Sequence, residues 1–353
     1  MDVQATFSGT REVDPRHALD MAALENWLAA HVDGYAGPLE VRQFKGGQSN
    51  PTYELITPTH RYVLRRKPPG TLLASAHAVD REFAVISALH AQGFPVARPY
   101  ALCTDDNVLG SMFYVMDKVE GRIFWDLKLP DSTPAERRTI WFEQVDTLAA
   151  LHRLEPHAIG LGDYGKPGNY FGRQVGRWTK QYRASEIDPV PAMDRLIDYL
   201  PQTLPPEGPV RIVHGDFRLD NMILDAGQPK VRAVLDWELS TLGDPMADFS
   251  YLLIAYAIPA SLRNGLLGAD LTALGIPSIE ELADRYGAQT GFGAPQNLDW
   301  LLAYNLFRLA AICQGIGGRV RDGTAASDQA RAMAAQVGPL ADAAWSYSRK
   351  AGA

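Results

Sequence analysis

The sequence predicts an α+β protein in which a strand-rich first third precedes a mainly helical remainder. Short β-branched and aromatic runs separated by turns occupy much of residues 39–119. Helical periodicity dominates from residue 134 onward, interrupted by two short strands, 222–225 and 231–235, that flank a turn containing Gly227. Because 353 residues exceed the usual size of one domain, we expect two lobes.

Composition restricts the possible function classes. A formal net charge of −7 gives no general attraction to nucleic acid. Cys103 and Cys313 show no metal-ligand spacing and indicate a reducing compartment rather than a disulfide scaffold. The first residues lack a secretory pattern, and the longest apolar run, near 251–259, is too short to span a bilayer. We therefore expect a cytoplasmic protein without nucleic-acid or membrane partners.

The first third contains a candidate ligand-binding loop between two predicted strands. Strands are expected at 39–44, 53–57, 61–66, 101–104 and 112–119, with helices at 17–31 and 79–92. Gly46 and Gly47 let the backbone approach a ligand closely, and successive N–H groups in such a loop can bind phosphate oxygens. Ser49 and Asn50 complete this candidate loop. A tight hairpin turn is the alternative, and the residues alone favour it.

The helical part contains a basic helix face with two interpretations. Helices are expected at 134–154, within 163–183 after an initial Gly/Pro loop, and at 193–200, 249–256, 279–290, 298–316 and 327–348. Arg173, Arg177 and Lys180 share one face of the second of these helices. A solvated basic face is one interpretation, and a docking surface for an anionic acceptor is the other. His152 is predicted to be a core histidine rather than a catalytic one.

The hairpin carries the residues with the clearest chemistry. Because a hairpin returns the chain to its start, Asn221 and Asp236 should emerge side by side. Their amide and carboxylate oxygens are ligands that Mg²⁺ takes in addition to substrate phosphates. Asp216 lies shortly before them and suits a base that orients a hydroxyl. Arg218 is placed to neutralise charge on a transferring phosphoryl group.

Three further polar residues flank this set. His214 is predicted to hold the loop by hydrogen bonding rather than to act as an acid or base. Asp244 and Asp248 follow the second strand and either cap a helix, brace the loop or bind the metal. Asp and Asn are also turn formers, so simple loop chemistry is the alternative for the whole set. A turn alone, however, does not require these residues in this order.

Taken together, these residues resemble a known family. H-G-D-F-R-L-D-N at 214–221, L-D-W-E at 235–238 and G-D-P-M-A-D at 243–248 are similar to the aminoglycoside phosphotransferase and choline kinase-like branch of the protein-kinase-like fold. The resemblance implies a bilobal fold: an N-lobe antiparallel sheet with one key helix, and a mainly helical C-lobe with a catalytic β-hairpin. It implies an N-terminal helical segment at 1–35, an N-lobe at 36–116 and a C-lobe at 117–353.

The resemblance also implies ATP and Mg²⁺ as cofactors, and it assigns the nucleotide contacts. It favours the glycine loop as a phosphate-binding loop over the hairpin-turn alternative. Arg65 stands where protein kinases carry a strand lysine that binds the phosphates, and Glu82 on the next helix would pair with it. Lys67 is the second candidate for the basic position.

The strand at 112–119 corresponds to the hinge between the lobes. Backbone groups from Asp117 to Val119 would meet the adenine edge, with Met116 beside it. The side chains at such a position carry little specific information, because the contacts that a hinge makes to adenine come from the backbone. This assignment therefore comes from the resemblance alone.

Other stretches resemble the kinase domains associated with acyl-CoA dehydrogenases. They are F-S-G-T-R, V-L-R-R-K-P-P-G, Y-F-G-R-Q-V-G-R-W-T-K-Q-Y and F-R-L-A-A-I-C-Q-G-I. This implies phosphoryl transfer from ATP to a small-molecule hydroxyl acceptor, such as a hydroxyacyl thioester. An aminoglycoside or amino-alcohol acceptor is the alternative. A nucleotide-binding regulatory module without catalysis and a metallohydrolase that uses the same acidic residues are interpretations from other classes.

Overall fold

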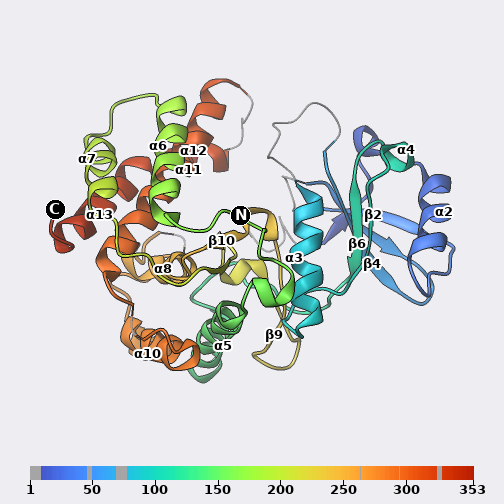
Figure 1. Cartoon of the computed structure of the whole chain (residues 1–353), viewed down its shortest axis with the longest axis horizontal. Helices are drawn as coiled ribbons and strands as arrows, with labels where there is room; N and C mark the ends of the chain where they lie inside the picture. Colours follow the sequence, from blue (N-terminus) through green and yellow to red (C-terminus); the bar gives the residue numbers. More distant parts are fainter. Residues whose placement is uncertain (1–8, 46–49, 69–77, 263, 294, 324–327) are drawn as a thin grey trace. The chain divides into compact units, whose positions relative to one another are not determined.

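The protein is described by a computed structural model that covers residues 9–45, 50–68, 78–262, 264–293, 295–323 and 328–353. Its chain divides into two compact units, and each unit is assembled from separate stretches of sequence (Figure 1). The first unit comprises Met1–Trp125, His157–Tyr164 and Leu219–Ser240. The second unit comprises Asp126–Pro156, Gly165–Arg218 and Thr241–Ala353. The lobe boundaries expected near residues 35 and 116 stay predictions.

The first unit is built on a six-stranded antiparallel sheet. Its strands are β1 (Thr10–Arg11), β2 (Glu40–Phe44), β3 (Thr52–Ile56), β4 (Arg61–Arg66), β5 (Pro99–Cys103) and β6 (Phe113–Asp117). They follow one another across the sheet in the order β1-β2-β3-β4-β6-β5, and every neighbouring pair is antiparallel. The expected α+β fold with an antiparallel sheet in its first part is confirmed.

Helices cover both faces of this sheet (Figure 1). They are α2 (Met21–His31), α3 (Val79–Ala91) and the short α4 (Asp106–Leu109), and the 3-10 turn η1 (Pro15–His17) precedes them. Alternation along β4 sends Tyr62 and Leu64 into the core that α2 completes. Arg65 directly follows Leu64, so its side chain points to the opposite face of the sheet, where α3 lies. The alternation of side chains along β4 thus places Arg65 on the face of the sheet that α3 covers.

A β-hairpin belongs to the same unit. It consists of β8 (Met222–Leu224) and β9 (Val231–Val234), between the 3-10 turns η4 (Leu219–Asn221) and η5 (Trp237–Leu239). The Val234 N–H donates to the Pro95 carbonyl at 2.8 Å, and Arg122 exchanges two backbone hydrogen bonds with Leu224. Gly121 permits this approach, because a Cβ there would lie 2.1 Å from the Leu224 carbonyl oxygen. The 3-10 turn η2 (His157–Ile159) completes the unit.

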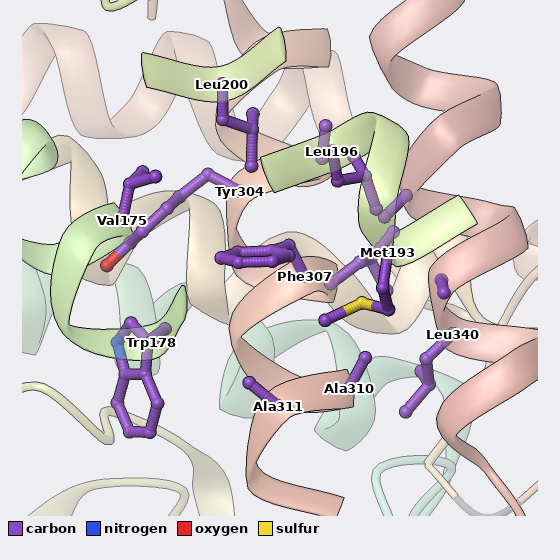
Figure 2. Close-up of a cluster of buried hydrophobic side chains, with 14 of the residues drawn as sticks. Val175, Trp178, Met193, Leu196, Leu200, Tyr304, Phe307, Ala310, Ala311 and Leu340 are labelled. Carbon is purple, nitrogen blue, oxygen red and sulfur yellow. The ribbon is translucent and has the colours of Figure 1, made fainter. Parts of the chain in front are cut away.

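The second unit is mainly helical. Its α-helices are α5 (Pro134–Arg153), α6 (Tyr170–Ser185), α7 (Pro191–Tyr199), α8 (Met246–Leu253), α9 (Leu271–Leu274), α10 (Ile279–Thr290), α11 (Leu298–Arg321), α12 (Asp328–Ala334) and α13 (Val337–Lys350). The strands β7 (Arg211–Val213) and β10 (Thr241–Gly243) pair antiparallel, and η3 (Leu200–Gln202) and η6 (Ile254–Ala257) are 3-10 turns. Figure 2 shows the core around α11, where Phe307 packs among Met193, Leu196 and Leu340.

The helix predicted at 327–348 is wrong as a single helix. The structure has α12 and α13 there, separated at residues 335 and 336. Pro339 explains the interruption, because it has no N–H to donate to the Ala335 carbonyl and its ring would clash with that group in a continuous helix. In the observed structure Pro339 lies in the first turn of α13, where a proline is tolerated.

Within the described part of the chain, every helix is too short or too polar to cross a bilayer.

Truncating Phe307 should destabilise the second unit, because its side chain is fully buried in the α11 core. We expect Phe307→Ala to lower the free energy of unfolding by about 3–5 kcal/mol. Leu267→Ala is the matched control, since Leu267 is 51% exposed, and should change stability by less than about 0.5 kcal/mol. Denaturant unfolding of both variants measures the difference, and equal losses would contradict this view of the core.

Candidate active site

In the first unit a buried arginine joins the sheet, helix α3 and the hairpin. Arg65 Nε lies 2.8 Å from Glu82 Oε2, and its Nη2 lies 2.8 Å from Asp236 Oδ1. Glu238 Oε2 is 3.5 Å from the same nitrogen. The Arg65 side chain is 11% exposed and that of Glu82 only 2%. The pairing of Arg65 with Glu82 expected from the sequence is therefore present.

Glu82 is held by neutral donors as well as by Arg65. Its Oε1 accepts a hydrogen bond from Asn50 Nδ2 at 2.9 Å, and its Oε2 accepts one from the Tyr114 hydroxyl at 3.1 Å. Burial raises the pKa of Glu82 to about 7 even though the charge of Arg65 acts in the opposite direction. The Asn50 side chain thus positions the partner of Arg65, and its expected contact with phosphate stays a prediction.

The hairpin brings the backbone of Asn221 beside the residue that precedes Asp236. The Leu235 N–H donates to the Asn221 carbonyl at 2.8 Å, so the residue before Asp236 lies beside Asn221. Asp236 adopts a left-handed backbone conformation with φ of 65°, uncommon for a non-glycine residue. Its side chain is 39% exposed, so the carboxylate is accessible. One amide and one exposed carboxylate fit the oxygen chemistry of Mg²⁺, and their role as metal ligands stays a prediction.

Asp216 belongs to the second unit, where polar neighbours hold it. The Tyr251 hydroxyl donates to Asp216 Oδ1 at 2.9 Å, and Arg218 Nε lies 3.4 Å from Oδ2. Burial alone would raise the pKa of Asp216, but Arg218, Tyr251, His214 and Arg308 together hold it below its ordinary value. Asp216 therefore contributes stability above the ordinary carboxyl pKa and loses this contribution as the pH falls through its folded pKa.

Asp248 and His214 brace the loop that carries Asp216. Asp248 is buried, and its carboxylate accepts the N–H groups of His214 at 2.6 Å and Gly215 at 2.9 Å. The Asp216 N–H donates to His214 Nδ1 at 3.2 Å, so His214 holds the loop as expected. His152 is fully buried and bonds the Tyr286 hydroxyl at 2.7 Å, in agreement with its prediction as a core histidine.

Asp244 accepts hydrogen bonds from two backbone N–H groups. It accepts the N–H groups of Met246 at 2.8 Å and Gly208 at 3.2 Å, and burial raises its pKa. Within the described ranges, no group of three or more His, Cys, Asp or Glu side chains is arranged to hold a metal ion. Asp248 thus braces the loop that carries Asp216, and Asp244 contacts the N–H of the first residue of α8 as well as that of Gly208.

Three of the predicted nucleotide contacts lie outside the described residues: Gly46, Gly47 and Ser49. In the segment predicted to be a hinge, the N–H groups of Asp117 and Lys118 donate to the carbonyls of Arg98 and Arg61. The Val119 N–H donates to no acceptor among the described residues, and its contact with an adenine edge stays a prediction.

The side chains of the predicted hinge segment and the backbone of Lys67 also make contacts within the first unit. The Asp117 carboxylate accepts hydrogen bonds from His60 and Tyr100. Met116 pairs with Val63 in the sheet. Lys67 extends the pairing of β4 and β6 through a 2.9 Å bond from its N–H to the Met112 carbonyl. Arg65, rather than Lys67, is the basic residue that contacts Glu82.

The profile of the phosphotransferase enzyme family (APH) matches residues 40–288 of the sequence. The chain belongs to this family. The family assignment makes it a kinase-type enzyme that acts on a small molecule, and it leaves the acceptor open.

Two curated relatives of this phosphotransferase show the same similarity over almost the whole chain. Acyl-CoA dehydrogenase family member 10 of Mus musculus is 42% identical over 97% of this chain, which corresponds to 32% of the mouse protein. Acyl-CoA dehydrogenase family member 11 of Rattus norvegicus is 42% identical over 97% of this chain and 45% of its own length. The chain thus spans less than half the length of these relatives, and neither name identifies a phosphoryl acceptor.

Solved structures show the same fold. A candidate aminoglycoside phosphotransferase from Ralstonia eutropha is 48% identical, with a TM-score of 0.88 over 94% of this chain and 99% of its own. A ternary complex of aminoglycoside phosphotransferase APH(4)-Ia with AMP-PNP and hygromycin B has a TM-score of 0.59 at 15% identity, over 94% of this chain and 99% of its own. At that identity the second likeness shows the protein-kinase-like fold alone.

Sequence reasoning missed two residues that touch the Asp216 loop of this phosphotransferase. Tyr251 follows Asp248 at helical spacing on α8, so both belong to one helix face, and this spacing was the available signal. Arg308 is the single cation in a long apolar stretch of α11 and donates to the Gly215 carbonyl. An arginine among core residues is costly without partners, which is a signal in itself. The contacts of Tyr251 with Asp216 and of Arg308 with Gly215 were revealed only by the three-dimensional structure.

The basic face of α6 borders an open hollow of about 700 Å³, lined by Gly172, Arg173, Gly176, Arg177, Lys180 and Gln181. A Cβ at Gly176 would meet nothing within 4 Å. Arg173 donates to the carbonyls of Lys166 and Pro167. Arg177 and Lys180 are exposed and form no ion pair with any described residue. The face therefore presents positive charge that the described residues do not neutralise.

Removing Glu82 should cost stability, because it leaves the buried Arg65 with only its hairpin partners. We expect Glu82→Ala to lower the free energy of unfolding by about 3–5 kcal/mol. Asp322→Ala is the control: it removes an exposed pair with Arg321 and should leave stability unchanged. Urea unfolding at neutral pH measures both variants. Similar values for the two would show that the Arg65 pair is not structurally important.

Proposed function

We propose that the chain catalyses ATP-dependent phosphoryl transfer to a hydroxyl group of a small anionic metabolite, of the hydroxyacyl thioester type. The observation that carries the proposal is Asp216, a carboxylate whose pKa is held low and whose Oδ1 is oriented by Tyr251. An ionised, oriented carboxylate is what a hydroxyl needs as a base that aligns it for attack.

The first unit supplies the nucleotide side of this proposal. Arg65 would bind the phosphates, and Glu82 would hold its guanidinium in place. Asn221 and Asp236 would hold Mg²⁺, which when bound neutralises charge on the phosphates. In this structure Asp236 Oδ1 contacts Arg65 Nη2. The AMP-PNP complex of the structural neighbour APH(4)-Ia supports ATP as the donor.

The second unit supplies the acceptor side. Asp216 accepts the proton of the attacking hydroxyl, and Arg218 places positive charge next to it. The unpaired cations Arg177 and Lys180 suit an acceptor with phosphate or carboxylate groups, such as a CoA thioester. They do not suit a polycationic aminoglycoside, because like charges repel. The names of the longer relatives, which are acyl-CoA dehydrogenase family members, agree with an acyl-CoA-type acceptor.

Replacing Asp216 tests the reaction. With a panel of hydroxyacyl-CoAs, aminoglycosides and amino alcohols, the wild type should release ADP in the presence of Mg²⁺ with at least one hydroxyacyl-CoA. We expect Asp216→Asn to lower kcat about 10²–10⁴-fold, since the base is lost. The dissociation constant for ATP, measured by calorimetry, should stay the same. Full activity in Asp216→Asn, or ATP-independent phosphoester hydrolysis by the wild type, would refute the proposal.

Neutralising the α6 face tests the acceptor class. We expect Arg177→Ala combined with Lys180→Ala to raise KM for a hydroxyacyl-CoA about tenfold, since each exposed cation contributes roughly 0.5–1 kcal/mol. KM for ATP should not move, and raising the salt concentration should reduce the difference. Arg349→Ala combined with Lys350→Ala removes the same charge from the exposed end of α13 and serves as the control. Equal effects of the two double variants would contradict an acceptor contact on α6.

A further inference from the structure

A buried cation from the distant helix α11 reaches the loop that carries Asp216. Arg308 is 5% exposed, and its guanidinium donates to the Gly215 carbonyl. Its Cζ lies 4.9 Å from the ring centre of Tyr251 and 5.5 Å from that of Trp178, which Figure 2 shows beside the α11 core. Among the described residues no carboxylate lies within ion-pair distance of Arg308. Its partners are therefore a backbone carbonyl and two aromatic faces.

The Gly215 peptide groups are held from two sides. Gly215 has φ of 86°, a conformation that L side chains rarely adopt. Its N–H donates to Asp248 Oδ1 at 2.9 Å, while its carbonyl accepts from Arg308. Because Asp216 is the next residue, these two bonds set the direction in which the chain presents it.

Tyr251 adds a third restraint, on the carboxylate itself. Its hydroxyl donates to Asp216 Oδ1 at 2.9 Å, and the ring that carries this hydroxyl lies beneath the Arg308 guanidinium. One cation therefore restrains Asp216 both through the backbone, at Gly215, and through the side chain, at Tyr251. A purely structural position in this core would be served at lower cost by an apolar side chain, because burying an arginine carries a large desolvation penalty.

We propose that Tyr251 and Arg308 are positioning residues for Asp216: Arg308 fixes the Gly215 carbonyl and the Tyr251 ring, and Tyr251 fixes the carboxylate. This inference rests on the proposed role of Asp216 as the base. Tyr251 touches Asp216 itself, Arg308 touches Gly215 and the Tyr251 ring, and both act through Asp216. An alcohol at Asp216 then meets a carboxylate of defined orientation, which is the main requirement of phosphoryl transfer.

The test compares Tyr251→Phe with Tyr256→Phe. The Tyr256 hydroxyl is also buried, but it donates to the Pro277 carbonyl at 2.6 Å and does not touch Asp216. We expect Tyr251→Phe to lower kcat about tenfold with KM for ATP unchanged. The charged or titratable groups that face Asp216 are Arg218, His214, Tyr251 and Arg308. Loss of the Tyr251 donor disfavours the ionised carboxylate, so the acid limb of the kcat/KM profile should move to higher pH. Tyr256→Phe should keep the wild-type profile.

Two further measurements make the outcome decisive. The Asp216 carboxyl resonance, assigned by its loss in Asp216→Asn, should titrate at higher pH in Tyr251→Phe, independently of any activity. Arg308→Lys keeps the charge but not the planar fork, and should lower kcat while leaving ATP affinity intact. If it fails to fold, Tyr251→Phe carries the test alone. An inactive Asp216→Asn beside a Tyr251→Phe with wild-type kcat and titration would overturn this inference only. An active Asp216→Asn would overturn the proposed function.

Discussion

The contact on which the first unit depends is the buried interaction of Arg65 with acidic partners from two different elements. Glu82 comes from α3 and Asp236 from the exit of the hairpin, so one guanidinium joins the sheet to both. A cation at this depth requires partners with good geometry, because an unpaired buried charge costs several kcal/mol. Asn50 and Tyr114 supply the remaining hydrogen bonds to Glu82. The sheet, the helix and the hairpin are thus parts of one electrostatic assembly.

The sequence predicted those parts of the site whose geometry follows from local patterns. The hairpin pattern placed Asn221 beside the end of β9, while the pairing of Arg65 with Glu82 came from the family resemblance. Helix ends were less accessible to this reasoning. The interruption before α13 depends on Pro339, whose effect was outweighed by an apolar pattern that continues through it.

The contacts that sequence reasoning could not reach are those between elements far apart in the chain. Arg308 and Gly215 are 93 positions apart, and nothing local relates them. Asn50 was predicted to contact phosphate from its place in a glycine-rich loop, and the bond from its amide to Glu82 on the next helix was not predicted. In both cases the side-chain type was informative, but its partner was set by packing of the whole unit. Local pattern finds the chemical groups, and tertiary structure decides which of them meet.

The discontinuous make-up of the two units has a consequence for any attempt to dissect this enzyme. The polypeptide passes from one unit to the other between Trp125 and Asp126, again around residues 156 and 164, and then between Arg218 and Leu219 and after Ser240. A single cut yields no fragment that consists of one unit alone, so truncation cannot isolate either unit. The passage at Arg218 falls between Asp216 and Asn221, so a cut there would also place these two residues in different fragments.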